Sequence, residues 1–127
     1  MIEPTTSDVR AWAVAATGDP DVEVTPWRVE RIAYGSPSPT TGGLWRIVGP
    51  SWSLFVKVVQ DYRHWDLLHM LPPAIRAEAL ATRSWRHEAD LYESDLASVL
   101  PPGMRLPVVH AVRDDGDGRV LVVMEDV

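Results

Sequence analysis

The chain has 127 residues, of which 46% are hydrophobic and 24% are charged, and this composition is typical of one folded domain with its own core. The formal net charge of -6 argues against a nucleic-acid-binding protein, because such proteins carry basic surfaces that neutralise phosphates. The sequence has no cysteine, no apolar run near the about 20 residues of a membrane span, and an acidic, polar start unlike a signal peptide. We therefore expect a cytoplasmic protein that binds neither nucleic acid nor membrane.

The first half of the chain predicts one helix and three strands. The helix is expected to begin at Thr6-Ser7-Asp8 and to end at Gly18, because small polar residues favour helix starts and glycine favours helix ends. Strand-like patterns follow at 27–33, 44–48 and 54–59. Nine residues without a large side chain, 35–43, join the first two strands, and a Gly-Pro-Ser turn joins the last two. These connections predict an antiparallel meander.

The second half predicts helices followed by a hairpin. We expect a helical insertion over 61–83, with a short helix at 65–70 and another helix started by Pro72-Pro73, since proline is well tolerated in a first helical turn. A longer helix is expected from Ser84 to Val99, where apolar residues recur every three or four positions. The last two predicted strands, 108–112 and 120–124, flank a turn rich in aspartate and glycine.

These elements indicate one domain over 1–127 with a helical extension over 1–20. The predicted strand at 120–124 lacks alternation, as expected of a strand covered on both faces. Helices that are separate in sequence from hairpin-connected strands are typical of the α+β class. The fold class is therefore predicted to be α+β, with a five-stranded antiparallel sheet and packed helices.

Lys57 lies inside the apolar strand at 54–59, and two interpretations of it are open. In the first, the lysine lies on the solvent face of an alternating strand, where lysines are common. In the second, the lysine is partly buried and needs a partner, because lysine is almost never buried without one. The candidate partner is Glu88, on the helix that follows the insertion.

Glu88 shares a predicted helical stripe with apolar residues at spacings of three and four, namely Trp85, Leu91, Tyr92 and Leu96. We expect this stripe to pack on the sheet, and a carboxylate on such a stripe needs a cation or several hydrogen bonds. Two alternatives are that Glu88 reaches water or that it pairs with the neighbouring Arg86 or His87. If the helix packs on the sheet, the carboxylate of Glu88 meets the ammonium group of Lys57.

A strand lysine held by a helix glutamate is a device for binding nucleotide phosphates, because the glutamate fixes the position of the ammonium group. The loop at 35–43 stands where it could cover those phosphates. Ser36, Ser38 and Thr40 could donate hydrogen bonds to phosphate oxygens. The small residues around them would let the backbone approach closely.

Taken together, these features resemble the N-terminal lobe of the aminoglycoside phosphotransferase family, which has a protein-kinase-like fold. The matching features are the loop at 35–43, the strand Phe55-Val56-Lys57, the helix at 86–92 that carries Glu88, the step at 100–109, and the strand end at 122–127. The resemblance extends from about residue 27 to residue 127. The loop departs from the spaced glycines of protein kinases, and the insertion at 61–83 has no assigned role.

The resemblance implies ATP as cofactor, with Lys57 contacting the α- and β-phosphates and Glu88 orienting the lysine as the second catalytic residue. It also implies an adenine pocket at the end of the last strand. Met124 would stand at the back of that pocket, and the backbone of Glu125 and Val127 would hydrogen-bond the adenine edge. Apolar stacking on the base is expected from Val56.

The resemblance further implies that the catalytic aspartate and the Mg²⁺-binding aspartate belong to a C-terminal lobe, which is absent from this chain. Mg²⁺ would therefore bind through the missing lobe, and no metal site is expected here, because the four histidines lack ligand spacing. The full-length protein is expected to transfer the γ-phosphoryl group of ATP to a hydroxyl of a small substrate, such as an aminoglycoside, a sugar or a choline-like alcohol. The fragment alone is expected to be inactive.

Two other functions remain open. The chain could be a non-catalytic kinase-like module that binds nucleotide or a protein partner. It could also be an interaction domain in which Lys57 and Glu88 form only a structural pair. An ATP-dependent thermal shift is expected for a nucleotide-binding protein and not for the interaction domain, whereas the downstream aspartates distinguish an enzyme from the non-catalytic module.

Overall fold

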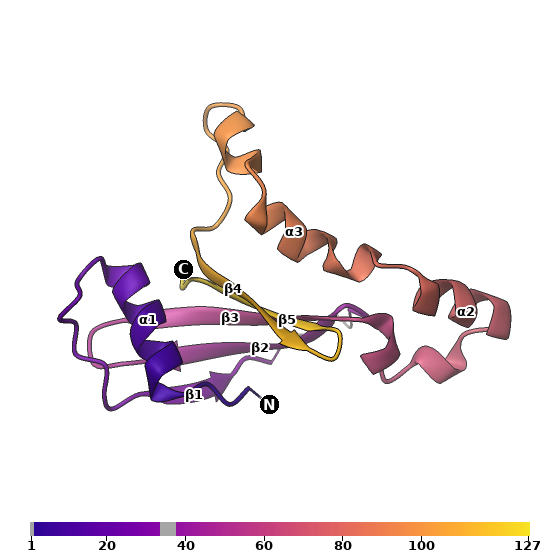
Figure 1. Ribbon diagram of the computed structural model, residues 1–127, viewed down its shortest axis with the longest axis horizontal. Helices are drawn as coiled ribbons and strands as arrows, with labels where there is room; N and C mark the ends of the chain where they lie inside the picture. The colour runs from indigo at the N-terminus through magenta and orange to yellow at the C-terminus, as the bar shows by residue number, and fades with distance from the viewer. Residues whose placement is uncertain (1, 34–37) are drawn as a thin grey trace.

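The computed structural model describes residues 2–33 and 38–127, and its centre is a single antiparallel sheet of five strands in the order β1-β2-β3-β5-β4 (Figure 1). The strands are β1 Arg28–Arg31, β2 Thr41–Val48, β3 Ser53–Gln60, β4 Val109–Gly116 and β5 Arg119–Glu125. The prediction of an α+β chain with five antiparallel strands is confirmed. Val120 to Met124 in β5 are all buried, as their non-alternating pattern predicted.

The central strand β3 pairs with β2 on one side and with β5 on the other. Lys57 lies opposite Leu44 of β2 and Val122 of β5. Because successive side chains of a strand point to opposite faces, Leu54, Val56 and Val58 face one side of the sheet and Phe55, Lys57 and Val59 face the other. We call these sides the α1 face and the α3 face, after the helix that covers each.

Helix α1, Thr6–Thr17, covers the α1 face and follows the sequence prediction. The Thr5 hydroxyl accepts a hydrogen bond from the Asp8 N–H, and the Asp8 carboxylate accepts one from the Thr5 N–H, both at 3.0 Å. This capping box satisfies two N–H groups that the helix start would leave unpaired. Gly18 ends the helix with a φ of 71°, a conformation that favours glycine.

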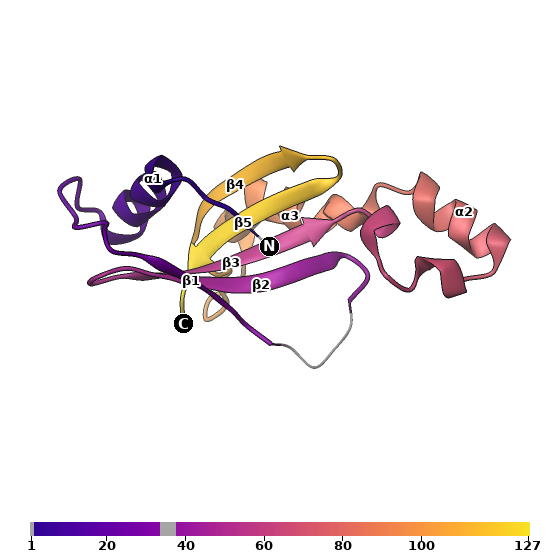
Figure 2. The ribbon, with the colours of Figure 1, turned by 90° about the horizontal axis from the view of Figure 1, so that it is seen from below.

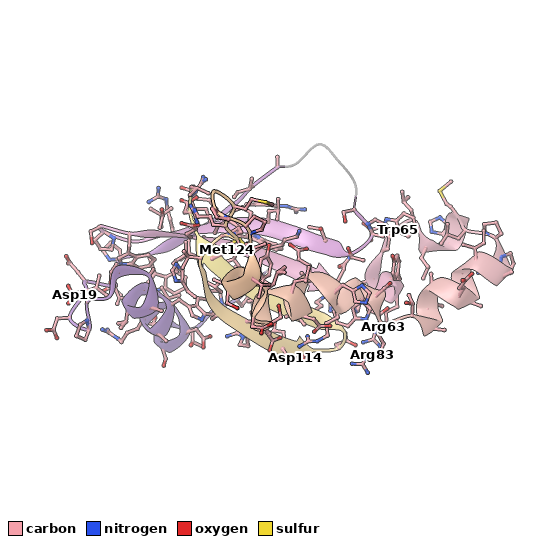
Figure 3. The ribbon with its side chains drawn as sticks, turned by 90° about the horizontal axis from the view of Figure 1, so that it is seen from above. Asp19, Arg63, Trp65, Arg83, Asp114 and Met124 are labelled. Atoms are coloured by element: carbon pink, nitrogen blue, oxygen red, sulfur yellow. The ribbon has the colours of Figure 1, made fainter. Side chains whose placement is uncertain are left out.

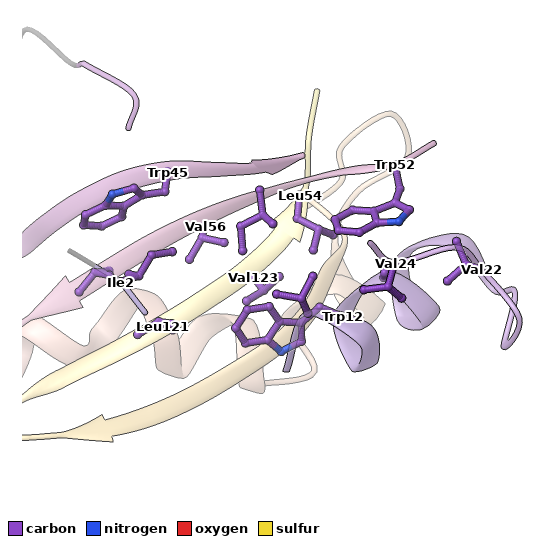
Figure 4. Close-up of a cluster of buried hydrophobic side chains, with 14 residues drawn as sticks. Ile2, Trp12, Val22, Val24, Trp45, Trp52, Leu54, Val56, Leu121 and Val123 are labelled. Carbon is purple, nitrogen blue, oxygen red and sulfur yellow. The ribbon is translucent and has the colours of Figure 1, made fainter. Parts of the chain in front are cut away.

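The described part of the N-terminal extension, 2–20, contributes Ile2, Val9, Trp12 and Ala13 to one of the two hydrophobic cores. Figure 4 shows Trp12 of α1 packed with Trp45 and Trp52 against side chains of β3 and β5. Three of the six tryptophans lie in this cluster with 6–7% of their surface exposed. The chain's own N-terminal helix thus covers part of the α1 face (Figure 2).

The helix expected over 84–99 is broken into three pieces, namely η3 Ser84–Arg86, α3 His87–Glu93 and η4 Leu96–Val99. The break is at Ser94, whose hydroxyl donates to the Leu91 carbonyl at 2.6 Å and accepts from the Leu96 N–H at 3.2 Å. Such side-chain hydrogen bonds compete with those of the helix backbone. The predicted burial of the stripe is wrong at Leu91, which is 48% exposed, whereas Trp85, Tyr92 and Leu96 are half-buried.

A shorter stripe made of η3 and α3 packs on the α3 face. Ala89 is fully buried, and Trp85 and Tyr92 are half-buried around it. They contact a second hydrophobic core on this face, which includes Val59, Val120, Val122 and Met124. Seen from above, α3 crosses in front of the sheet (Figure 3).

The insertion at 61–83 forms an arm that reaches beyond the sheet (Figures 1 and 2). It contains two short 3₁₀ turns, η1 Tyr62–His64 and η2 Leu68–Met70, in place of the single helix expected at 65–70, and then α2 Pro73–Ala81, whose first residue is the expected proline. The base of the arm is tied to the β4–β5 hairpin, where the Asp61 N–H donates to the Gly118 carbonyl at 2.8 Å. In residues 2–33 and 38–127, no helix has the length and apolar character needed to cross a bilayer.

Candidate functional site

Lys57 and Glu88 form an ion pair between the central strand and the helix that crosses it. The Lys57 Nζ lies 2.7 Å from Glu88 Oε2 and 2.9 Å from Oε1, so both carboxylate oxygens contact the ammonium group. The side chains are 22% and 34% exposed, which leaves the pair open to solvent on one side. Of the two interpretations of Lys57, the structure therefore supports the paired one.

Lys57 is the only lysine among twelve lysine and arginine residues of the chain. Arginine cannot lose its charge and spreads it over a planar fork, whereas lysine carries a compact charge on a flexible stem. Every other cation of this sequence is an arginine, so the single lysine at the centre of the sheet is an informative signal. Composition alone could have directed attention to position 57.

Arg86, which immediately precedes α3, does not compete with Lys57 for the carboxylate of Glu88. Arg86 instead contacts Asp90 at 3.2 Å and Glu93 at 3.1 Å, so the alternative Arg86–Glu88 pair is not formed. The Tyr92 hydroxyl lies one turn along the helix and donates to Glu88 Oε1 at 3.4 Å. Burial, and then the negative charge of Glu88, raise the pKa of Tyr92, so this phenol stays protonated as a donor.

Val56 does not share the face of Lys57. It is fully buried in the cluster under α1 (Figure 4), so the expectation that Val56 stacks on a base beside Lys57 is wrong. Adjacent strand residues point to opposite faces, so this alternation would have shown from the sequence alone that Val56 and Lys57 lie on different faces. The apolar residue on the correct face is Phe55, two positions before the lysine.

Phe55 and Met124 lie side by side on the α3 face. The two residues are register partners between β3 and β5, and Phe55 packs against the core that contains Met124. Phe55 is half-buried and Met124 is 6% exposed. The half-buried phenyl ring thus presents apolar surface on the face of Lys57, and the buried Met124 lies beside it.

The loop that follows β1 is anchored where it enters β2, at the end of β3. The Thr40 carbonyl accepts a hydrogen bond from the Gln60 N–H at 2.8 Å, and the Ser38 carbonyl accepts one from the Thr41 N–H at 3.2 Å. Ser38 also lines a pocket of about 390 Å³ between this loop and the arm, and Lys57 is not among its lining residues. Ser36 lies outside the described residues.

The end of β5 is held from both sides. The Glu125 carboxylate pairs with Arg105 and accepts the Val108 N–H at 2.9 Å, and the Glu125 N–H donates to the Val108 carbonyl at 2.8 Å. The hydrogen bond from Arg105 lowers the pKa of Glu125 most, and the hydrogen bond from the Val108 backbone lowers it further. Val127 follows with 96% of its surface exposed, so its backbone lies at the surface beside this anchored turn.

Asp126 contributes a set of contacts that the sequence did not indicate. Its Oδ2 accepts a hydrogen bond from Arg46 Nε at 2.8 Å and one from the Ser53 hydroxyl at 2.7 Å. The Asp126 side chain is only 13% exposed. The hydrogen bond from Arg46 lowers the pKa of Asp126, so the carboxylate is ionised at neutral pH.

A hollow of about 430 Å³ lies away from the Lys57–Glu88 pair. Its lining includes Trp45, Val58 and Leu121, which belong to the α1 face, and it does not include Lys57. The chemistry of the lysine–glutamate pair and this hollow are therefore on opposite sides of the sheet. In the described part of the chain, no group of three or more histidine, aspartate or glutamate side chains could hold a metal ion.

Comparisons with known proteins add no family to this geometry: no family model, no curated protein and no solved structure matches the chain.

Proposed function

We propose that this chain is the ATP-binding lobe of a cytoplasmic small-molecule phosphotransferase of the aminoglycoside phosphotransferase type. The observation that carries the proposal is the bidentate Lys57–Glu88 pair, with both N–O distances below 3 Å, between a central strand and a packed helix. The strand order β1-β2-β3-β5-β4 adds support, because it places the lysine strand beside the strand that leads out of the sheet.

At the phosphate end, Lys57 supplies a positive charge whose position is fixed by Glu88. Glu88 is itself held by Tyr92 at 3.4 Å. A cation held in place before the nucleotide binds needs little reorganisation when charge develops on the phosphates. The partial exposure of the pair leaves room for phosphate oxygens to approach the ammonium group from the open side.

At the base end, Phe55 provides an aromatic surface on the face of Lys57, and Met124 packs beside it on β5. A planar base stacks favourably on such a ring. Because the Glu125 N–H already donates to the Val108 carbonyl, the adenine edge would be hydrogen-bonded by the carbonyl of Glu125 and the backbone of Val127. Ser38 and Thr40 would reach the phosphates from the loop, which lies beside the last residue of β3.

Among the described residues, no group of three or more histidine, aspartate or glutamate side chains could hold a metal ion. Mg²⁺, the catalytic base and the pocket for a small hydroxylated substrate would come from a second lobe. Mg²⁺ supplies charge neutralisation on the transferring phosphoryl group in such enzymes. The contribution of this chain is to hold the nucleotide, by charge at one end and by stacking and backbone hydrogen bonds at the other.

The test uses the full-length protein and an ATP analogue that acylates lysine. Because Lys57 is the only lysine in residues 1–127, a modified peptide from this part of the protein can carry the label only at Lys57. We expect acylation of Lys57, protection by ATP, and a fall in kcat/KM of roughly 10²-fold or more in Lys57→Met and Glu88→Gln. Glu93→Gln is the matched control, since Glu93 lies on the same helix and pairs with Arg86.

Three outcomes are informative. Protection together with phosphoryl transfer supports the proposal. Protection without transfer to any hydroxylated acceptor would favour the non-catalytic nucleotide-binding module. Labelling that ATP does not reduce would refute nucleotide binding at Lys57 and leave the ion pair as a structural contact.

A further inference from the structure

The segment that leaves β5 is fastened to the sheet by a buried carboxylate. Asp126 is 80 positions from Arg46 and 73 positions from Ser53, and it contacts both through the same oxygen, Oδ2, at 2.8 and 2.7 Å. Arg46 lies in β2 and Ser53 begins β3. One carboxylate oxygen therefore joins the exit of β5 to the two strands beyond it.

The Arg46 side chain comes from the face where the nucleotide is proposed to bind. Arg46 is the register partner of Phe55, which in turn pairs with Met124, so the three side chains form a row across β2, β3 and β5. The guanidinium group extends from this row to Asp126. The same arginine thus borders the proposed stacking surface and holds the backbone beyond it.

The Asp126–Arg46 ion pair is expected to stay charged on both sides at neutral pH. The Asp126 side chain is 13% exposed and the Arg46 side chain is 38% exposed, so the carboxylate is largely shielded from water while the arginine stays partly exposed. The hydrogen bond from Arg46 is the main cause of the lowered pKa of Asp126. A charge-assisted hydrogen bond of this kind is roughly twice as strong as a neutral one.

We infer that Asp126, held by Arg46 and Ser53, is a positioning residue that fixes the backbone at 125–127 for the adenine edge. The inference rests on the proposed function and adds a residue to it. A backbone edge that is already in place loses less conformational freedom on binding. Asp126 therefore acts on the affinity for the base, whereas Lys57 acts on the affinity for the phosphates.

The experiment separates the two ends of the nucleotide in the full-length protein. Adenosine tests the base end and inorganic tripolyphosphate tests the phosphate end, each by isothermal titration calorimetry. In Asp126→Asn we expect adenosine and ATP to bind about tenfold more weakly, with tripolyphosphate unchanged. Lys57→Met should instead weaken the binding of tripolyphosphate and leave the binding of adenosine unchanged. Asp115→Asn is the matched control, because it removes an exposed carboxylate that pairs with Arg113 at 3.2 Å on the α1 face.

Arg46→Met and Ser53→Ala provide two further routes to the same measurement if Asp126→Asn fails to fold. Both should weaken adenosine binding and leave tripolyphosphate binding unchanged. Wild-type affinity for adenosine in all three variants overturns the inference and leaves the proposed function standing. Equal losses for both ligands also overturn it, because they indicate a general loss of structure. A wild-type protein that binds neither ligand refutes the proposed function itself.

Discussion

The Lys57–Glu88 pair permits a quantitative prediction about stability. Removing Lys57 alone leaves a half-buried carboxylate without its cation, and removing the charge of Glu88 alone leaves the ammonium group without its anion. In a double-mutant cycle of Lys57→Met and Glu88→Gln, the double variant should therefore be less destabilised than the sum of the two single variants.

The exposure of the pair sets the size of the coupling. Exposed ion pairs contribute about 0.2–1 kcal/mol, and breaking a buried pair costs about 3–5 kcal/mol. The side chains are 22% and 34% exposed and make two short contacts, so we expect a coupling of about 1–2 kcal/mol, between these limits.

Urea unfolding measures the coupling without adding ionic strength, and coincident transitions by fluorescence and circular dichroism would justify a two-state treatment. At about 1 M salt the screening length falls to about 3 Å, yet a partly buried pair should keep more than half of its coupling. A coupling below about 0.3 kcal/mol, or one that disappears in salt, would show that the pair behaves as an ordinary surface contact.

Two other predictions follow from the same structure. The lowered pKa of Asp126 means that its ionised form stabilises the fold above its ordinary pKa of 3.8, and that this contribution is lost as the pH falls below that value. The difference in unfolding free energy between the wild type and Asp126→Asn should thus be constant above about pH 5 and shrink towards about pH 2; a constant difference throughout would contradict the assignment. Trp12→Ala should cost about 3–5 kcal/mol, because Trp12 is 6% exposed in the core under α1, whereas substitution of the exposed Ala11 by serine should change the urea midpoint little.

Local patterns in the sequence predicted most of the secondary structure. The limits of α1 follow from Thr5, Asp8 and Gly18, whose effects act within one turn of the chain. The strands β2 and β3 follow from apolar runs and the turn between them. The helix expected over 84–99 was wrong because its apolar periodicity says nothing of the Ser94 hydroxyl, which competes for backbone groups at that position.

The sequence also indicated which residues near Lys57 share its face of the sheet, because side chains of a strand alternate between the two faces. Lys57 and Phe55 are two residues apart, so they share a face, while the adjacent Val56 cannot. The pairing of Lys57 with Glu88 was one of several possibilities at the level of sequence. It became definite only when α3 packed on the sheet through Ala89, which brought the carboxylate to the ammonium group.

The sequence by itself determined the five strands and the limits of α1, because capping, alternation and turn residues act over a few positions. Only the tertiary structure decided which distant side chains meet. Asp126 reaches Arg46 and Ser53 across 80 and 73 positions, and no local pattern encodes a contact of that range. The physical reason is that such contacts depend on the order of the strands in the sheet and on the face that each helix covers, and both are set by packing of the whole chain.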